Sequence, residues 1–255
     1  MDFTEKTASG RRSAIVTGAA HGIGLAITER LAASGTQVVL SDLDEAAGEA
    51  AAKSLRERGY SAVFHRADVS DAAEVTALVG AAEDAFGKVD ILVNNAGVIS
   101  TGDLDSVSVE QWNKVLAVDL TAVFLTTKSV SGGMRDRGWG RIVNVASVAA
   151  QVGGGLLGNS VYAAAKGGVL SLTKGTAREL ARHGVTCNAV CPSLTETPMT
   201  AGMPAERREA ILSAIPVARG AQPDEIAAAV EFLASDDAAF ITGATLNVDG
   251  GLVRA

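Results

Sequence analysis

The sequence is poor in aromatic residues and in basic charge. Aromatic side chains make up 4 % of its 255 residues, and 22 Lys and Arg stand against 29 Asp and Glu, which gives a formal net charge of −7. Proteins that bind nucleic-acid phosphates usually gather Lys and Arg into a basic surface. No such cluster is visible, so no nucleic-acid partner is expected. The hydrophobic fraction of 47 % indicates a large buried core and argues against disorder.

Long apolar runs and a cysteine framework are also missing. No window of about 18 consecutive apolar residues occurs, so no membrane-spanning segment is expected. The first twelve residues are polar and lack the apolar region of a signal peptide, which predicts a cytoplasmic protein. Cys187 and Cys191 are the two cysteines, and on one strand they would lie about 13 Å apart, too far for a disulfide. We expect two buried thiols and no metal site.

Short apolar runs alternate with helical patterns along the chain. Strands are predicted at 13–17, 37–41, 61–66, 89–93, 141–146, 185–191 and 244–248. Helices are predicted at 22–34, 44–58, 71–86, 109–135, 160–182 and 223–234. Repeated strand–helix units imply parallel strands with helices on both faces. We therefore predict an α/β protein with one doubly wound Rossmann-type domain and a seven-stranded parallel sheet, covering residues 11–255 after a tail of residues 1–10.

The segment after the sixth strand departs from this alternation. Residues 199–222 combine Met, Pro and Gly with a short charged helical patch. Because ligands of such folds lie beyond the carboxyl ends of the strands, we expect this segment to form a mobile cover over the site.

A glycine-rich turn joins the first strand to the first helix. It reads Thr17-Gly18-Ala19-Ala20-His21-Gly22-Ile23-Gly24. Glycines let the backbone turn sharply and approach a pyrophosphate, which the N–H groups and the positive end of the helix then hold. Its place between strand and helix predicts a dinucleotide site. The expected contacts are Gly18, His21, Gly22, Ile23 and Gly24.

An acidic residue closes the second strand. Asp42 lies about twenty residues beyond the glycines, where a carboxylate accepts hydrogen bonds from ribose hydroxyls and repels a 2′-phosphate. No Arg or Lys follows closely, so NAD (NADH) is favoured over NADP. Asp42 has a second possible role as the cap of the helix near Asp44. Leu43 is expected beside the ribose, and Asp68 and Val69 at the adenine.

Tyr162 and Lys166 stand four residues apart at the start of a predicted helix, so their side chains share one face. An ammonium near a phenol stabilises the phenolate and makes tyrosine a usable acid or base. Ser147 follows the preceding strand, and its hydroxyl is placed to share this site. The three residues form a candidate catalytic group.

With these motifs the chain resembles the short-chain dehydrogenase/reductase family over nearly its whole length. The matching residues are Thr17-Gly18-x-x-x-Gly22-x-Gly24, Asn94-Asn95-Ala96-Gly97, Ser147, Tyr162-x-x-x-Lys166, Pro192 with Thr197, Ile241-Thr242-Gly243 and Asp249-Gly250-Gly251. The Tyr–Lys spacing looks unlike that of the enoyl reductases of this fold.

The resemblance implies a role for each matching residue. Tyr162 would transfer the proton to or from the substrate oxygen, Ser147 would position that oxygen, and Lys166 would bind the nicotinamide ribose and lower the pKa of Tyr162. Further cofactor contacts would come from Asn95, Ala96, Gly97, Pro192, Thr195 and Thr197. The helices 109–135 and 160–182 resemble the pair through which family members form homotetramers.

Three positions depart from the family pattern. Asp119 stands where the family usually has a fourth catalytic residue, an asparagine that holds a water in a proton relay. Its charge would raise the pKa of Lys166 and weaken the effect of that lysine on Tyr162, so Asp119→Asn is expected to stay active with a lower pH optimum. The gap of fifteen between Ser147 and Tyr162 is slightly long, and Ser193 follows Pro192 where glycine is common.

The expected substrate is a neutral or mostly apolar secondary alcohol or its ketone. Residues 148–161 carry no charge, and in this fold they would line the substrate pocket together with 98–104 and 199–216. Sugar alcohols, cyclic alcohols and hydroxyacyl thioesters stay open.

Two other functions are compatible with the sequence. A 3-oxoacyl-[acyl-carrier-protein] reductase would prefer NADPH and would dock its acidic carrier on basic residues, for which Arg135, Arg137, Arg141 and Arg182 are candidates. The net charge and Asp42 argue against it. A binding protein that senses NAD(H) without catalysis is the other alternative, and Asp119 and the long Ser147–Tyr162 gap are its support.

Overall fold

The structure is a computed structural model that describes residues 10–154 and 158–253. The tail predicted over residues 1–10 lies outside the described residues, except for Gly10.

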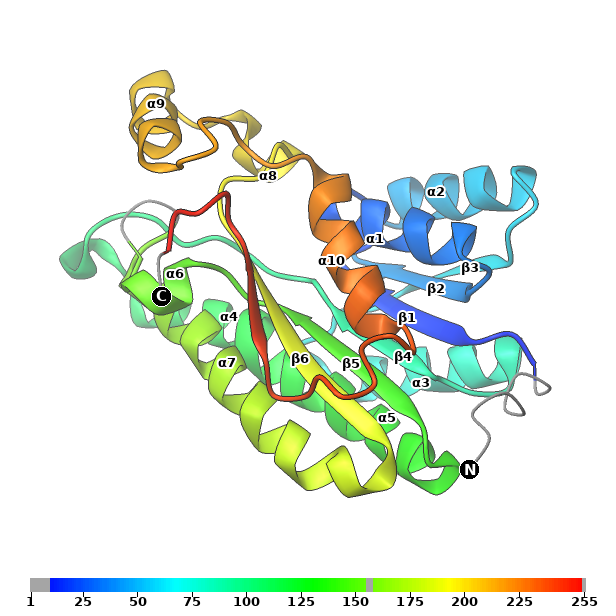
Figure 1. The fold of residues 1–255 in the computed structure, drawn as a ribbon. Coiled ribbons are helices and arrows are strands. Elements are labelled where there is room, and N and C mark those ends of the chain that lie inside the picture. Colours follow the sequence, from blue (N-terminus) through cyan, green and yellow to red (C-terminus); the bar gives the residue numbers. More distant parts are fainter. Residues whose placement is uncertain (1–9, 155–157, 254–255) are drawn as a thin grey trace.

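Seven parallel strands form one sheet, as predicted (Figure 1). They are β1 (Ser13–Thr17), β2 (Gln37–Asp42), β3 (Ala62–Arg66), β4 (Ile91–Asn94), β5 (Gly140–Val145), β6 (Val185–Pro192) and β7 (Thr245–Val248). Their order is β3-β2-β1-β4-β5-β6-β7. Because β1 pairs with both β2 and β4, the chain leaves it in opposite directions across the sheet, which opens a crevice above its carboxyl end.

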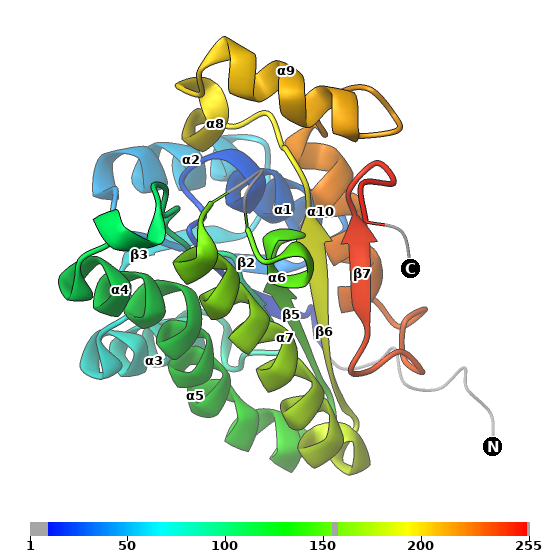
Figure 2. The same cartoon turned by 90° about the vertical axis from the view of Figure 1, so that its left-hand side faces the viewer.

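Helices cover both faces of the sheet. The longer ones are α1 (Gly22–Ala33), α2 (Glu45–Glu57), α3 (Ala72–Phe86), α4 (Val109–Leu116), α5 (Ala122–Arg137), α7 (Ser160–Leu180), α9 (Ala205–Ala214) and α10 (Pro223–Ala234). Shorter ones are α6 (Ala149–Val152), α8 (Pro198–Ala201), η1 (Leu104–Ser106) and η3 (Ala181–His183). In Figure 2, α1, α2 and α10 lie on one side of the sheet and α3, α4, α5 and α7 on the other.

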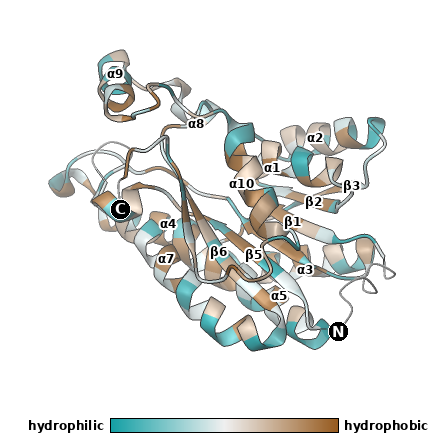
Figure 3. Cartoon of the chain, in the orientation of Figure 1, coloured by the Kyte–Doolittle hydropathy of each residue, from teal (hydrophilic) through white to brown (hydrophobic). Residues whose placement is uncertain are grey.

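Successive side chains of a strand point to opposite faces of the sheet, so the strands contribute to a hydrophobic core on each face. Ala14 and Val16 of β1 pack in the cluster that contains residues of α1 and α10, whereas Ile15 between them belongs to the cluster with α3, α5 and α7. The strands β1, β4, β5 and β6 are buried on both faces, as is typical of strands inside a parallel sheet that is covered by helices. Hydropathy colouring shows largely brown strands between helices with teal outer turns (Figure 3).

The helix predicted over 109–135 runs from Val109 to Arg137 but contains a π-helical turn, η2 (Ala117–Thr121). By length and composition this helix is apolar enough to cross a membrane. Its apolar residues have a place in the fold, because Val123, Val130 and Met134 are buried in the cores beneath it. The wider turn contains Asp119, and π turns often mark functional positions.

Candidate active site

A cavity of about 700 Å³ opens at the carboxyl ends of the central strands, a volume typical of ligand sites. Most of the predicted site residues line it: Gly18, His21, Gly22, Ile23, Asp42, Leu43, Asp68, Val69, Asn95, Ala96, Gly97, Ser147, Tyr162, Lys166, Pro192, Thr195 and Thr197. The acidic residues after β2 and β3 lie at one end, and the candidate catalytic side chains lie at the ends of β5 and α7. The predicted cofactor-binding residues and the predicted catalytic residues therefore line one cavity.

The glycine-rich turn has a tightly packed backbone that depends on its glycines. Gly18 and Gly22 have φ angles of +63° and +53°, values that side-chain-bearing residues rarely adopt. A Cβ on Gly18 would lie 2.8 Å from the Ala96 Cα. The turn leads directly into α1, whose first N–H groups are available to an anion. These features fit the pyrophosphate of a dinucleotide.

Gly24 was predicted to contact the cofactor and does not line the cavity. A Cβ at this position would overlap the carbonyl oxygen of Gly18. Gly24 is therefore required for packing of the turn against the first turn of α1. This is a structural role that the motif alone does not separate from ligand contact.

Thr17 and Asn95 join two of the recognised motifs. The Thr17 hydroxyl accepts hydrogen bonds from the backbone N–H groups of Asn95 and Ala96, both at 3.1 Å. The Asn95 amide donates in return to the carbonyls of Thr17 and Gly18 at 3.0 and 2.9 Å. The glycine-rich turn is thus tied to the segment after β4.

The sequence left open whether Asp42 caps the following helix or faces the cofactor, and the structure gives the cap to Asp44. Asp44 caps α2 by accepting from the Ala47 N–H at 3.0 Å, so Asp42 is not the helix cap. The Asp42 carboxylate accepts from the N–H of Ala20 at 3.0 Å and of Asp44 at 3.1 Å. These bonds fix it at the cavity wall. Asp44 also holds the His21 imidazole at 3.0 Å.

Asp68 is likewise fixed at the cavity wall. One of its carboxylate oxygens accepts from both the hydroxyl and the N–H of Ser70, at 2.6 and 2.9 Å. These bonds lower the pKa of the Asp68 carboxyl. It therefore presents a negative charge where the adenine contact was predicted.

Ser147, Tyr162 and Lys166 meet at the other end of the cavity. Ser147 is 4 % exposed and Lys166 also 4 %. The Lys166 ammonium donates to the Val145 carbonyl at 3.1 Å and lies 5.8 Å from the centre of the Tyr162 ring. Asn159 caps α7 through the Tyr162 N–H at 3.2 Å, which fixes where the helix, and with it Tyr162, begins.

The pKa of Tyr162 depends on its burial and on its charged neighbours. Burial raises the pKa of the phenol, Asp119 adds to this rise, and Lys166 and Ser147 oppose it without reversing it. For Lys166, burial alone would lower the pKa of the ammonium, but the charge of Asp119, with a smaller contribution from Tyr162, outweighs burial, so that pKa is raised. The family resemblance implied that Lys166 lowers the pKa of Tyr162, and Lys166 does act in that direction, but burial has the larger effect.

Asp119 lies behind the cavity wall and is fully buried, at 0 % exposure. Its Oδ1 accepts from the Val98 N–H at 2.8 Å, and its Oδ2 lies 3.4 Å from the Lys166 ammonium. A Cβ on Gly97 would come within 3.2 Å of that Oδ2, so Gly97 separates the carboxylate from the cavity. Burial raises the pKa of Asp119, and Lys166 and Val98 oppose this. As predicted, Asp119 raises the pKa of Lys166.

The expected substrate-pocket segments contribute unequally. Val98, Ile99, Met199 and Thr200 line the cavity, whereas none of the described residues between 148 and 161 does. The sequence reasoning also missed Lys114, Ser70 and Val118 in the lining. Lys114 and Val118 stand four residues apart in the helix predicted over 109–135, a spacing that places both on one face of the helix. That spacing is visible in the sequence, but no motif linked this face to the site.

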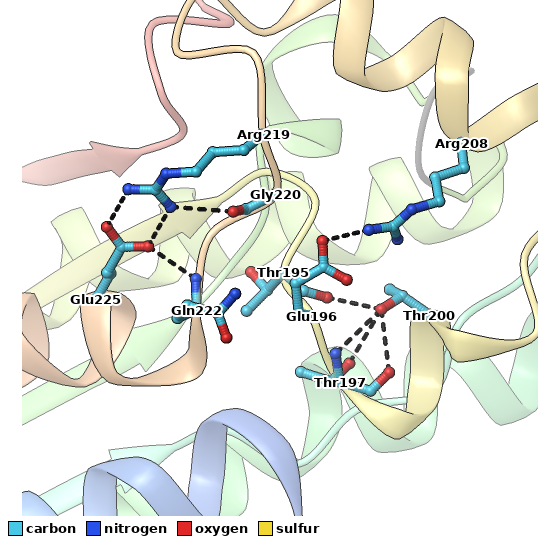
Figure 4. A network of polar contacts seen from close by, with 9 residues as sticks. All are labelled: Thr195, Glu196, Thr197, Thr200, Arg208, Arg219, Gly220, Gln222 and Glu225. Atoms are coloured by element: carbon cyan, nitrogen blue, oxygen red, sulfur yellow. Dashed lines mark hydrogen bonds and ion pairs between the residues drawn. The ribbon is translucent and has the colours of Figure 1, made fainter.

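Two neighbouring segments, residues 195–197 and 220–222, connect the predicted cover to the rest of the chain, and we call them the neck of the cover (Figure 4). Thr195 forms a parallel bridge with Ala221, so the outgoing and returning segments lie side by side. The Thr200 hydroxyl donates to the Thr195 carbonyl at 2.6 Å. Arg208 of α9 pairs with Glu196, and a Cβ on Gly220 would overlap that carboxylate. The neck therefore fastens α9 to the end of β6.

The basic residues considered for carrier docking do not surround the cavity. Arg141 is 3 % exposed, lies 3.7 Å from Asp236 and stacks on Trp139. It lies near the start of β5, Arg135 and Arg137 lie in the last turn of α5, and Arg182 lies in η3, at the edge of the sheet opposite the cavity. Docking of a carrier on these residues stays a prediction of the alternative function.

The cysteines are two buried free thiols, as predicted. Burial raises the pKa of Cys187 to about 12. No group of three His, Cys, Asp or Glu residues that is suited to a metal ion occurs within the described ranges.

A Rossmann-type sheet, a glycine turn fitted to a pyrophosphate and a Ser–Tyr–Lys group at one cavity define an oxidoreductase that uses a nicotinamide dinucleotide. Comparison with known proteins agrees. The profile described as "Enoyl-(Acyl carrier protein) reductase" matches residues 18–253. The chain belongs to the short-chain dehydrogenase/reductase family.

Relatives and solved structures cover almost the full chain. A cis-4-hydroxycyclohexanecarboxylate dehydrogenase from Sinomonas cyclohexanicum is 43 % identical over 94 % of this chain and 96 % of its own length. A 3-oxoacyl-[acyl-carrier-protein] reductase from Synechocystis sp. is 44 % identical over 97 % and 99 %. The crystal structure of an actinorhodin polyketide ketoreductase variant with NADPH matches with a TM-score of 0.89, 40 % identity and coverage of 95 % and 97 %.

Proposed function

We propose that this chain interconverts a neutral or mostly apolar secondary alcohol and its ketone with NAD(H). The observation that carries the choice of cofactor is Asp42, a carboxylate fixed by two backbone N–H groups at the cavity wall after β2. A 2′-phosphate beside it would meet like charge without a compensating Arg.

The neighbourhood of Asp42 supports the same choice. His21 is the nearest basic side chain in the sequence motif, and its imidazole is bound by Asp44. A second carboxylate thus lies beside the first. The structure with NADPH is that of a relative, and the choice made by this chain rests on its own Asp42.

The catalytic roles follow from the positions of three side chains. Bound NAD(H) supplies or accepts the hydride. Tyr162 gives a proton to the substrate oxygen or removes one, Ser147 directs its hydroxyl at that oxygen, and Lys166 holds the ribose and adjusts the acidity of Tyr162. Both Ser147 and Tyr162 line the cavity.

A cyclic alcohol fits the proposed substrate class. Ile99 and Met199 are apolar side chains that line the cavity and are exposed, and one relative is named for a hydroxycyclohexane carboxylate. We therefore place cyclic secondary alcohols and ketones first. A cytoplasmic location and a homotetramer stay predictions from sequence and resemblance.

The test is to incubate the protein with a panel of ketones and NADH, and with the matching alcohols and NAD. The absorbance of NADH reports turnover. The same panel is then measured with the 2′-phosphorylated cofactors. We expect turnover of cyclic or apolar members and a higher kcat/KM with NADH. Equal or better turnover with NADPH would reject the role given to Asp42.

The alternative is a 3-oxoacyl-[acyl-carrier-protein] reductase, which is favoured by the Synechocystis relative. It predicts NADPH as the better cofactor and a carrier-bound 3-oxoacyl thioester as a much better substrate than the free thioester. Comparing these two thioesters separates the alternatives, because a small-molecule enzyme gains nothing from the carrier.

A further inference from the structure

Asp119 introduces a buried negative charge beside the pair that performs acid–base catalysis. We propose that Asp119 is a positioning residue that acts through Lys166 to keep Tyr162 protonated, and thereby favours ketone reduction over alcohol oxidation at neutral pH. This inference rests on the acid–base role of Tyr162 in the proposed function.

The geometry makes Asp119 a partner of Lys166. Its Oδ1 is fixed by the Val98 N–H at 2.8 Å, which directs Oδ2 toward the ammonium at 3.4 Å. Asp119 is 0 % and Lys166 4 % exposed, so water screens the pair weakly. The lysine also donates to the Val145 carbonyl at 3.1 Å. Its position is therefore set by groups away from Tyr162.

The charge balance decides the state of the phenol. Lys166 lies 5.8 Å from the centre of the Tyr162 ring, and a lone ammonium there would strongly stabilise a phenolate. The carboxylate offsets that charge, so loss of the phenolic proton leaves the group of three residues with a net negative charge. In a buried site this state is unfavourable.

Other groups around the pair do not replace this effect. Cys191 of β6 faces both Tyr162 and Lys166, but burial raises the pKa of its thiol and keeps it neutral. Ser147, at the end of β5, contributes a neutral hydroxyl. Among the described residues, Asp119 is the carboxylate that acts directly on this lysine and tyrosine.

The consequence differs between the two directions of reaction. In reduction, the Tyr162 O–H bond breaks and its proton joins the substrate oxygen, while the carbonyl carbon receives the hydride of NADH. In oxidation, the phenolate takes the hydroxyl proton and the hydride leaves to NAD. A protonated phenol is thus ready for reduction, whereas oxidation requires higher pH.

The chain permits a direct titration, because it contains two tyrosines. In a Tyr60→Phe background, the ultraviolet absorbance of phenolate reports Tyr162 alone, without cofactor or substrate. We expect Asp119→Asn to move the midpoint to lower pH. Below the midpoint, each unit of displacement is a tenfold change in the phenolate fraction. Asparagine retains an oxygen for the Val98 N–H, and Asp119→Ser removes the same charge if the first variant does not fold.

Asp90→Asn is the matched control. Asp90 is 4 % exposed and pairs with Lys88 at 2.9 Å, but it lies just before β4, at the opposite edge of the sheet. Its removal changes net charge equally and should leave the Tyr162 midpoint in place. An equal shift in this control would assign the effect to overall charge and overturn the proposal.

Kinetics supply the second readout. In Asp119→Asn, the rising limb of kcat/KM for alcohol oxidation should move to lower pH, and the falling limb for ketone reduction should move with it. Unchanged midpoints in both titration and kinetics would overturn the proposal. Activity retained by Tyr162→Phe would instead reject the proposed function, while the absorbance titration would still report the charge coupling.

Discussion

Two carboxylates give this site its individual character at the residue scale. Asp42 is held at the cavity wall by backbone N–H groups, and Asp119 is held behind it by Val98. We propose that the first acts on the choice of cofactor and the second on Lys166 and Tyr162. Each therefore calls for a different measurement.

Replacing Asp42 by Ser should weaken the preference for NADH. The variant removes the charge that opposes a 2′-phosphate, so the ratio of kcat/KM for NADH to that for NADPH should fall about tenfold or more, because about 1.4 kcal/mol of lost repulsion is a factor of ten. Steady-state rates with both cofactors measure this. Asp71→Asn, at the cap of α3, is a control that should leave the ratio unchanged.

Replacing Tyr162 by Phe should remove turnover but not the fold. Loss of a positioned acid or base typically costs about 10²–10⁴ in rate, so kcat should fall at least about a hundredfold, while binding of NADH, followed by fluorescence, persists. Full activity in this variant would exclude Tyr162 as the acid or base. Absence of turnover in the parent chain as well would favour the NAD(H)-sensing alternative.

The sequence predicted which residues gather at the site better than it predicted how deeply each side chain is buried. Tyr162, Lys166 and Ser147 follow from spacing and strand position. The burial of Asp119 behind Gly97 and the packing role of Gly24 do not, because both depend on contacts between distant segments. The pKa of Tyr162 depends on the balance of burial and two opposite charges, which no motif specifies.

At the scale of elements, the glycine turn and α1 form a rigid pair. Gly24→Ala should disrupt this pair, since the added Cβ overlaps the Gly18 carbonyl. We expect loss of cofactor binding together with destabilisation of about 1–3 kcal/mol. Chemical denaturation and NADH titration measure the two effects. Gly80→Ala in α3 is the control, because a Cβ there meets nothing within 4 Å.

The neck of the cover is the second element with a testable role. Arg208→Gln breaks the pair with Glu196 and should free α9, whose Ile211 is buried against the end of the sheet. We expect a higher KM for the ketone with kcat within about twofold, and faster proteolysis between 198 and 215. Unchanged KM and proteolysis would show that the pair does not hold α9.

Element types were largely predictable, but their irregularities were not. Strands bounded by glycine and helices with caps follow from local pattern. The π turn at Ala117–Thr121 interrupts a helix that reads as continuous, because its extra residue places Asp119 against Val98 and Lys166. The short helices α6 and α8 lie in segments without a clear helical period, whereas the charged patch within 199–222 indicated α9.

At the scale of the whole molecule, the parallel topology follows from the repeated units, and the seven-stranded sheet confirms it. The four arginines considered for carrier docking show what only the fold supplies at this scale. Arg141 lies near the start of β5, so it lies at the edge of the sheet away from the cavity. A count of charges does not say which edge of the sheet each charge occupies.

Burial in the two cores also predicts the behaviour of the thiols. Cys187 has a pKa of about 12 and both cysteines are 0 % exposed, so neither should react with a thiol reagent in the native chain. Denaturant should release two reactive thiols. Rapid reaction under native conditions would contradict the packing of β6.

The most direct test of the account is the rate of NADH oxidation by the parent chain with cyclic and apolar ketones, measured beside NADPH and beside Tyr162→Phe. The account predicts turnover that prefers NADH and that falls at least about a hundredfold in the variant. A preference for NADPH, or undiminished turnover without the phenol, would contradict it.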